Sequence, residues 1–82
     1  MEKDTKALKI EISTPFIKLD QLLKFAALCQ SAGEAKMRII DGLVLVDGEK
    51  CLQRGRKIRP GQRVCALFCG REIEVSGPRE NG

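Results

Sequence analysis

The sequence contains no histidine, no tryptophan and no tyrosine, and its only aromatic residues are three phenylalanines. Without histidine, the usual base that activates a serine or cysteine nucleophile is missing. A glycine-rich phosphate-binding loop and a pair of acidic residues in a catalytic motif are missing as well. We therefore expect a protein that is not an enzyme and has no small-molecule substrate or cofactor.

Long hydrophobic runs are also absent. No apolar run approaches the roughly 20 residues that a membrane-spanning helix needs, and the charged residues 1–6 do not lead into the apolar segment of a secretory signal. The expected location is thus the cytoplasm. The 82 residues are enough for one domain, spanning 1–82, and a polar tail with proline and glycine at 76–82 is expected to be flexible.

Acidic residues are absent from positions 50–71, although the whole chain has 11 of them against 15 lysines and arginines. The cations in this acid-free stretch are Lys50, Arg54, Arg56, Lys57, Arg59, Arg63 and Arg71. A charge run is often only a solvated loop, but here no nearby carboxylate would offset the mutual repulsion. The stretch therefore predicts a surface that binds an anionic partner.

The first half of the chain predicts one strand and two helices. Apolar and charged residues alternate over 7–13, which is typical of an edge strand with one buried face. Leucines and alanine then recur at helical spacing over 18–28. Ser31 and Glu34 fit a capping box that begins a second helix, with Ala35, Ile39 and Ile40 toward the core. That helix is expected to end at Gly42.

The second half predicts strands joined by tight turns. A β-branched run at 43–46 leads into Asp47-Gly48, a strong hairpin signal. Another turn is expected at 59–62, followed by strands at 63–68 and 71–75. Together these elements predict an α+β fold in which a helix pair packs on one face of a small, mainly antiparallel sheet.

The four cysteines, Cys29, Cys51, Cys65 and Cys69, raise the question of a zinc site. Structural zinc sites normally show two close pairs of ligands, whereas only Cys65 and Cys69 are near each other here. We expect no metal and no disulfide, with Cys29 exposed at the end of the first helix.

A set of segments in a fixed order carries a family resemblance. The segments are Lys18-Leu19-Asp20, Ser31 with Glu34-Ala35-Lys36, residues 42–48 (GLVLVDG) and residues 54–62 (RGRKIRPGQ). Over about residues 16–68, the chain resembles the alpha-L RNA-binding domain, also called the S-four (S4) domain, and in particular its short, stand-alone, ribosome-associated members. Three departures stand out, since many members have arginine where this chain has Lys18 and Ala32, and Gln62 replaces the usual aspartate of a turn.

The resemblance implies a basic surface on the helix pair and the neighbouring turn that docks on structured RNA, such as ribosomal or transfer RNA. The residues expected to bind RNA are Lys18, Lys36, Lys50, Arg54, Arg56 and Lys57. Such cations contact phosphates and release counterions, while the shape of the folded RNA sets the register. The protein is expected to act as a monomer. The alternative is a protein–protein adaptor that uses the same basic face on an acidic partner.

Overall fold

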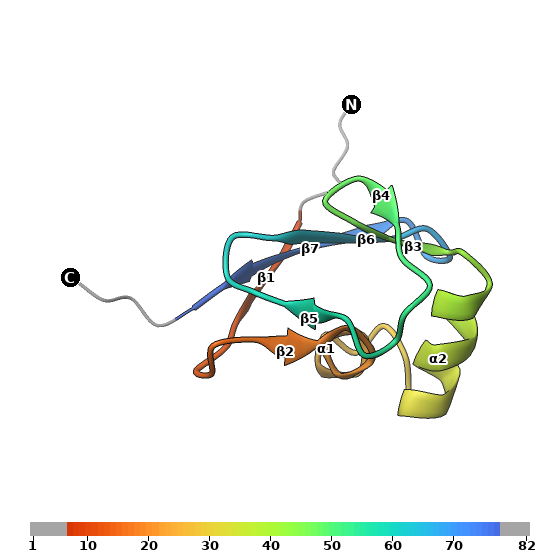
Figure 1. Cartoon of the computed structure of the whole chain (residues 1–82), viewed down its shortest axis with the longest axis horizontal. Coiled ribbons are helices and arrows are strands. Elements are labelled where there is room, and N and C mark those ends of the chain that lie inside the picture. The colour runs from red at the N-terminus through yellow and green to blue at the C-terminus, as the bar shows by residue number, and fades with distance from the viewer. Residues whose placement is uncertain (1–6, 78–82) are drawn as a thin grey trace.

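The computed structural model describes residues 7–77 (Figure 1). Its elements are β1 (Leu8–Glu11), β2 (Ile17–Lys18), α1 (Leu19–Phe25), α2 (Ala32–Ile40), β3 (Val44–Val46), β4 (Glu49–Lys50), β5 (Lys57–Ile58), β6 (Arg63–Ala66) and β7 (Arg71–Ser76). Ser76, the first residue of the tail that is expected to be flexible, is the last residue of β7, and residues 78–82 of that tail lie outside the described part of the chain.

Five strands form the main sheet in the order β1-β7-β6-β3-β4. All neighbours are antiparallel except β1 and β7, which run parallel with Leu8 opposite Ile73. β1 lies at the sheet edge, as its alternating pattern predicts. The Asp47-Gly48 hairpin is also confirmed, because both residues have positive φ, as a type I′ turn requires.

Both helices lie on one side of this sheet (Figure 1), which confirms the expected α+β arrangement. The core joins apolar side chains of the helices to those of the sheet, with Leu22 and Leu23 from α1 and Ile39 from α2 fully buried. Ile40, which was expected to face the core, is instead 51% exposed on the outer face of α2. The helix turns by about 100° per residue, so a second isoleucine next to Ile39 cannot share its inward direction.

The first helix ends at Phe25, three residues before its expected end at position 28. Ala27 adopts φ 64°, and the amides of Ala27 and Leu28 donate to the carbonyls of Lys24 and Leu23. These two bonds form a Schellman cap, which normally uses glycine in the left-handed position. An alanine there gives no sequence signal of a helix end.

The second helix follows its sequence signals closely. The hydroxyl of Ser31 accepts from the Glu34 amide at 3.2 Å, and the Glu34 carboxylate accepts from the amide of Gln30, one residue before the cap. At the other end, Gly42 has φ 78° and the Leu43 amide donates to the Arg38 carbonyl. None of the described helices has the length and apolar character needed to span a membrane.

Candidate functional site

The start of α1 is bound by the loop that precedes β5. Lys18, at the N-cap position, makes no side-chain cap. Instead, the amide of Leu19 donates to the Arg56 carbonyl at 2.9 Å, and the amide of Asp20 donates to the Arg54 carbonyl at 3.1 Å. These bonds satisfy first-turn amides that would otherwise lack a partner. They also fix two arginines of the acid-free stretch beside the beginning of α1.

A two-stranded ladder, β2 with β5, places two lysines opposite each other. Ile17 pairs with Ile58, which is fully buried, and Lys18 pairs with Lys57, which is exposed. No sequence pattern indicates this ladder, because each strand has only two residues. Like charges directly opposite each other destabilise a strand pair, so the isoleucine pair, with Ile58 buried and Ile17 half-buried, must hold these two lysines opposite each other.

Lys18, Arg54, Arg56 and Lys57 thus come from two segments that the fold joins, and we call them the basic cluster. Within residues 7–77, no carboxylate lies within 4.0 Å of Lys18, Arg56 or Lys57. Other cations are paired, since Arg38 lies 3.6 Å from Glu34 and Arg63 lies 3.4 Å from Glu72. The basic cluster therefore carries charge that the described part of the protein leaves largely uncompensated.

Arg54 has one acidic neighbour, Asp20, whose carboxylate lies 4.0 Å away. Asp20 is the one charged residue of the described chain that is buried, at 6% exposure, and its Oδ1 has no hydrogen-bond partner there. Its position in the first turn of α1 matches the preference of acidic residues for helix N-termini. Asp20 thus pairs with Arg54 at the start of α1, while the Arg54 side chain stays more than half exposed.

Two of the three phenylalanines lie under cations. The ammonium of Lys57 is 4.9 Å from the centre of the Phe16 ring, and the guanidinium of Arg38 is 5.1 Å from that of Phe68. Such cation–π contacts fix the direction of a long side chain. The third phenylalanine, Phe25, is 62% exposed and has no cation over its ring among the described residues.

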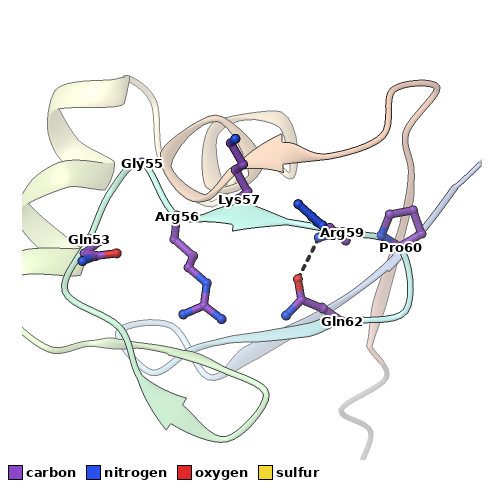
Figure 2. A pocket seen from close by; sticks show the side chains of 7 residues that line it. All are labelled: Gln53, Gly55, Arg56, Lys57, Arg59, Pro60 and Gln62. Carbon is purple, nitrogen blue, oxygen red and sulfur yellow. Dashed lines mark hydrogen bonds between the residues drawn. The ribbon is translucent and has the colours of Figure 1, made fainter.

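A hollow of about 700 Å³ lies beside the basic cluster and is lined by residues of the 53–62 segment (Figure 2). Arg56 extends into it, whereas Lys57 points to the other side of β5, toward β2. Gln53, Arg59 and Gln62 also line it, although none of them is among the residues expected to bind RNA. Arg59 belongs to the acid-free charge run, which could have marked it, whereas the glutamines carry no charge signal.

Gln62 links the turn at 59–62 to the β3–β4 hairpin. Its side-chain oxygen accepts from the Arg59 amide at 2.8 Å, and its side-chain amide donates to Asp47 at 2.9 Å. The Asp47 carboxylate also accepts from the Arg63 amide at 3.0 Å. The pKa of Asp47 is held below its usual value mainly by the bond from the Arg63 amide and, to a smaller extent, by the bond from the Gln62 side chain.

The two other expected RNA-binding residues lie on different elements. Lys36 is exposed in the middle of α2. Lys50, on β4, runs along the backbone of Gly42, and a β-carbon at that glycine would lie 3.2 Å from its Cδ. A cation beside the C-terminus of α2 also complements the helix dipole. Among the described residues, no hydrogen bond, ion pair or strand pairing connects Lys36 or Lys50 to the basic cluster.

All four cysteines are free thiols, and their exposure differs. Cys29 is only 4% exposed, so the expectation that it lies at the surface is wrong, because the chain turns inward after the cap at Ala27. Burial raises the pKa of the Cys29 and Cys65 thiols. Cys69 is exposed. The described residues contain no group of three or more cysteine, aspartate or glutamate side chains placed to hold a metal ion.

Comparisons with known proteins point to one family. A model of the S4 domain matches residues 10–76, which is more than the segment of about 16–68 that carries the resemblance. A protein of Bacillus subtilis (strain 168) named "Probable ribosome maturation protein RlbA" is 44% identical over 68 residues, which cover 83% of this chain and 83% of that protein.

Proposed function

Because the chain belongs to the S4 domain family, we propose that it is a non-catalytic protein that docks on structured RNA through its basic cluster. Residues 1–82 serve as one RNA-binding domain in this proposal. Lys36 and Lys50 extend the surface from α2 and β4. The protein binds as a monomer, and its place of action is the cytoplasm.

The uncompensated charge of the basic cluster carries this proposal. Lys18 and Lys57 are held opposite each other, and among residues 7–77 no carboxylate relieves their repulsion. An arrangement of this kind lowers stability unless a polyanion occupies it. Phosphates of an RNA backbone supply that negative charge and release their counterions on binding.

A folded RNA fits this surface better than an extended single strand. Proteins that bind single strands stack successive bases on exposed aromatic rings. Here the rings of Phe16 and Phe68 lie under Lys57 and Arg38, which leaves Phe25 as the single exposed ring of residues 7–77, and one ring cannot stack successive bases. Recognition would rest instead on phosphate contacts and on the shape of a double-stranded or compact RNA. The name of the Bacillus subtilis relative refers to ribosome maturation, which makes ribosomal RNA the favoured partner.

A charge-matched pair of variants tests the proposal. In one variant Lys18 and Lys57 both become glutamine, and in the control Lys9 and Lys24, which are exposed elsewhere, both become glutamine. Affinity for a hairpin from ribosomal RNA is measured by fluorescence anisotropy between about 50 and 200 mM salt. If each lysine contacts one phosphate, the first variant lowers the slope of log affinity against log salt by about 2, whereas the control leaves it nearly unchanged.

Equal losses in both variants would show that only net charge matters, and the basic cluster would then be the wrong surface. If the wild-type protein binds an acidic protein but not the RNA, the adaptor hypothesis replaces the present one.

A further inference from the structure

The hollow beside the basic cluster contains side chains with unused hydrogen-bonding capacity. Both ends of the Gln62 side-chain amide are engaged there, because its oxygen accepts from the Arg59 backbone amide and its NH₂ group donates to Asp47. In contrast, the Gln53 amide and the Arg56 guanidinium make no hydrogen bond or ion pair within residues 7–77. Both residues line the hollow, and Arg56 extends into it (Figure 2).

The walls of the hollow are fixed in place by backbone hydrogen bonds. The Arg56 amide donates to the Gln53 carbonyl at 3.2 Å, which closes a tight turn and keeps these two residues close together. On the opposite wall, the Gly61 amide donates to the Val75 carbonyl at 2.8 Å and so attaches the Pro60-Gly61 turn to β7. The hollow is therefore held by the fold rather than by mobile side chains alone.

The lining suits a nucleobase as well as a phosphate. A phosphate offers only acceptors, so the two arginines that line the hollow, Arg56 and Arg59, would be sufficient for it. The Gln53 amide offers a donor and an acceptor side by side, as base edges do. A guanidinium plane such as that of Arg56 can stack on an unstacked base, and a volume of about 700 Å³ leaves space for both groups.

Gly55 leaves the backbone of this wall open. A β-carbon at this position would meet no protein atom within 4 Å, and its φ lies outside the range that favours glycine. The fold therefore does not require glycine there. A bare backbone does let a ligand approach closely.

We propose that this hollow receives one unpaired nucleotide of the bound RNA, with the base stacked on Arg56 and its edge hydrogen-bonded by Gln53. The inference rests on the proposed function and names the RNA feature that is recognised: a bulged or otherwise extrahelical nucleotide next to a helix held by the basic cluster. A nucleotide that is already unpaired enters at little energetic expense, because no base pair has to be opened.

Two RNA hairpins test this inference, identical except for a single-nucleotide bulge in one stem. We expect the wild-type protein to bind the bulged hairpin about 10-fold more tightly. Gln53→Ala and Gly55→Val should each reduce that preference to about 2-fold and leave affinity for the fully paired hairpin unchanged. Gln30→Ala, at another exposed glutamine, should keep the preference. Circular dichroism checks that each variant folds.

The outcomes separate the two proposals. If the wild-type protein binds both hairpins equally well, or if the preference survives both Gln53→Ala and Gly55→Val, the hollow does not receive a nucleotide and this inference fails alone. If the wild-type protein binds neither hairpin nor any other structured RNA, the proposed function itself fails.

Discussion

The side-chain amide of Gln62 donates a hydrogen bond to the carboxylate of Asp47 at 2.9 Å, across 15 positions of sequence. An aspartate, which the family usually has at the position of Gln62, could accept from the Arg59 amide but could not donate to Asp47 when ionised. The expected turn at 59–62 is retained, since the backbone amide of Gln62 donates to the Arg59 carbonyl. Glutamine adds a connection between one wall of the hollow and the β3–β4 hairpin.

Replacing Gln62 by glutamate should destabilise the protein. The new carboxylate can still accept from the Arg59 amide, but it faces Asp47 with a second negative charge. We expect the free energy of unfolding in urea to fall by about 1 kcal/mol at neutral pH. Gln53→Glu, on the other side of the hollow and without such a partner, should change it by less than about 0.5 kcal/mol. Equal effects of the two substitutions would contradict a specific Asp47–Gln62 contact.

The stabilisation from Asp47 should depend on pH. Because the folded protein lowers the pKa of Asp47 below its usual value of 3.8, the ionised form stabilises the fold above that value. This contribution is lost as the pH falls through the lower pKa of the folded state. The stability difference between wild type and Asp47→Asn, measured by urea unfolding, should therefore shrink as the pH is lowered from neutral to about 2. A constant difference over this range would exclude the ionised carboxylate as the cause.

The two helix ends should respond in opposite ways to exchange of alanine and glycine. Ala27→Gly removes the strain of a left-handed alanine and should raise the free energy of unfolding by about 0.5 kcal/mol, after allowing for the greater freedom of glycine when unfolded. Gly42→Ala introduces such strain and a close contact with Lys50, so it should lower stability by more than about 1 kcal/mol. Thermal unfolding of both variants against wild type measures this, and destabilisation by Ala27→Gly would contradict the assigned cap.

Thiol reagents should distinguish the four cysteines. Cys69 is exposed and should react first with a disulfide reagent at neutral pH, whereas Cys29 and Cys51 are buried and should react only after local or global unfolding. Cys69→Ser should abolish the fast phase. Cys65 is half-buried and should react at an intermediate rate. If the fast phase persists in the Cys69→Ser variant, the assignment of Cys69 as the exposed thiol is wrong.

Much of the fold was predictable because local chemistry and tertiary packing agree. The Asp47-Gly48 turn, the Ser31 cap and the Gly42 helix end all use residues whose conformational preferences are strong. Two features were not predictable from such signals. The ladder of β2 and β5 has only two residues per strand, and the α1 end uses Ala27 in a conformation that alanine rarely adopts.

The candidate site shows the same division. The acid-free stretch identified Arg54, Arg56 and Lys57 by composition, and the resemblance added Lys18. Only the fold shows that Lys18 lies opposite Lys57 and that the Arg56 carbonyl binds the Leu19 amide, since these contacts join segments far apart in sequence. Gln53 carries no charge and no helical or strand pattern, so its place in the hollow had to come from the structure.

The parallel pairing of β1 with β7 has a consequence for the order in which the molecule forms during synthesis. Residues near the two ends of the described chain are neighbours in the sheet, with Leu8 opposite Ile73 and Glu11 opposite Ser76. The contacts of α1 with α2 and of β3 with β4 join segments that are close in sequence and emerge together, but β1 has no strand to pair with until β7 has emerged. A nascent chain that stalls before Arg71 would therefore expose the apolar face of β1.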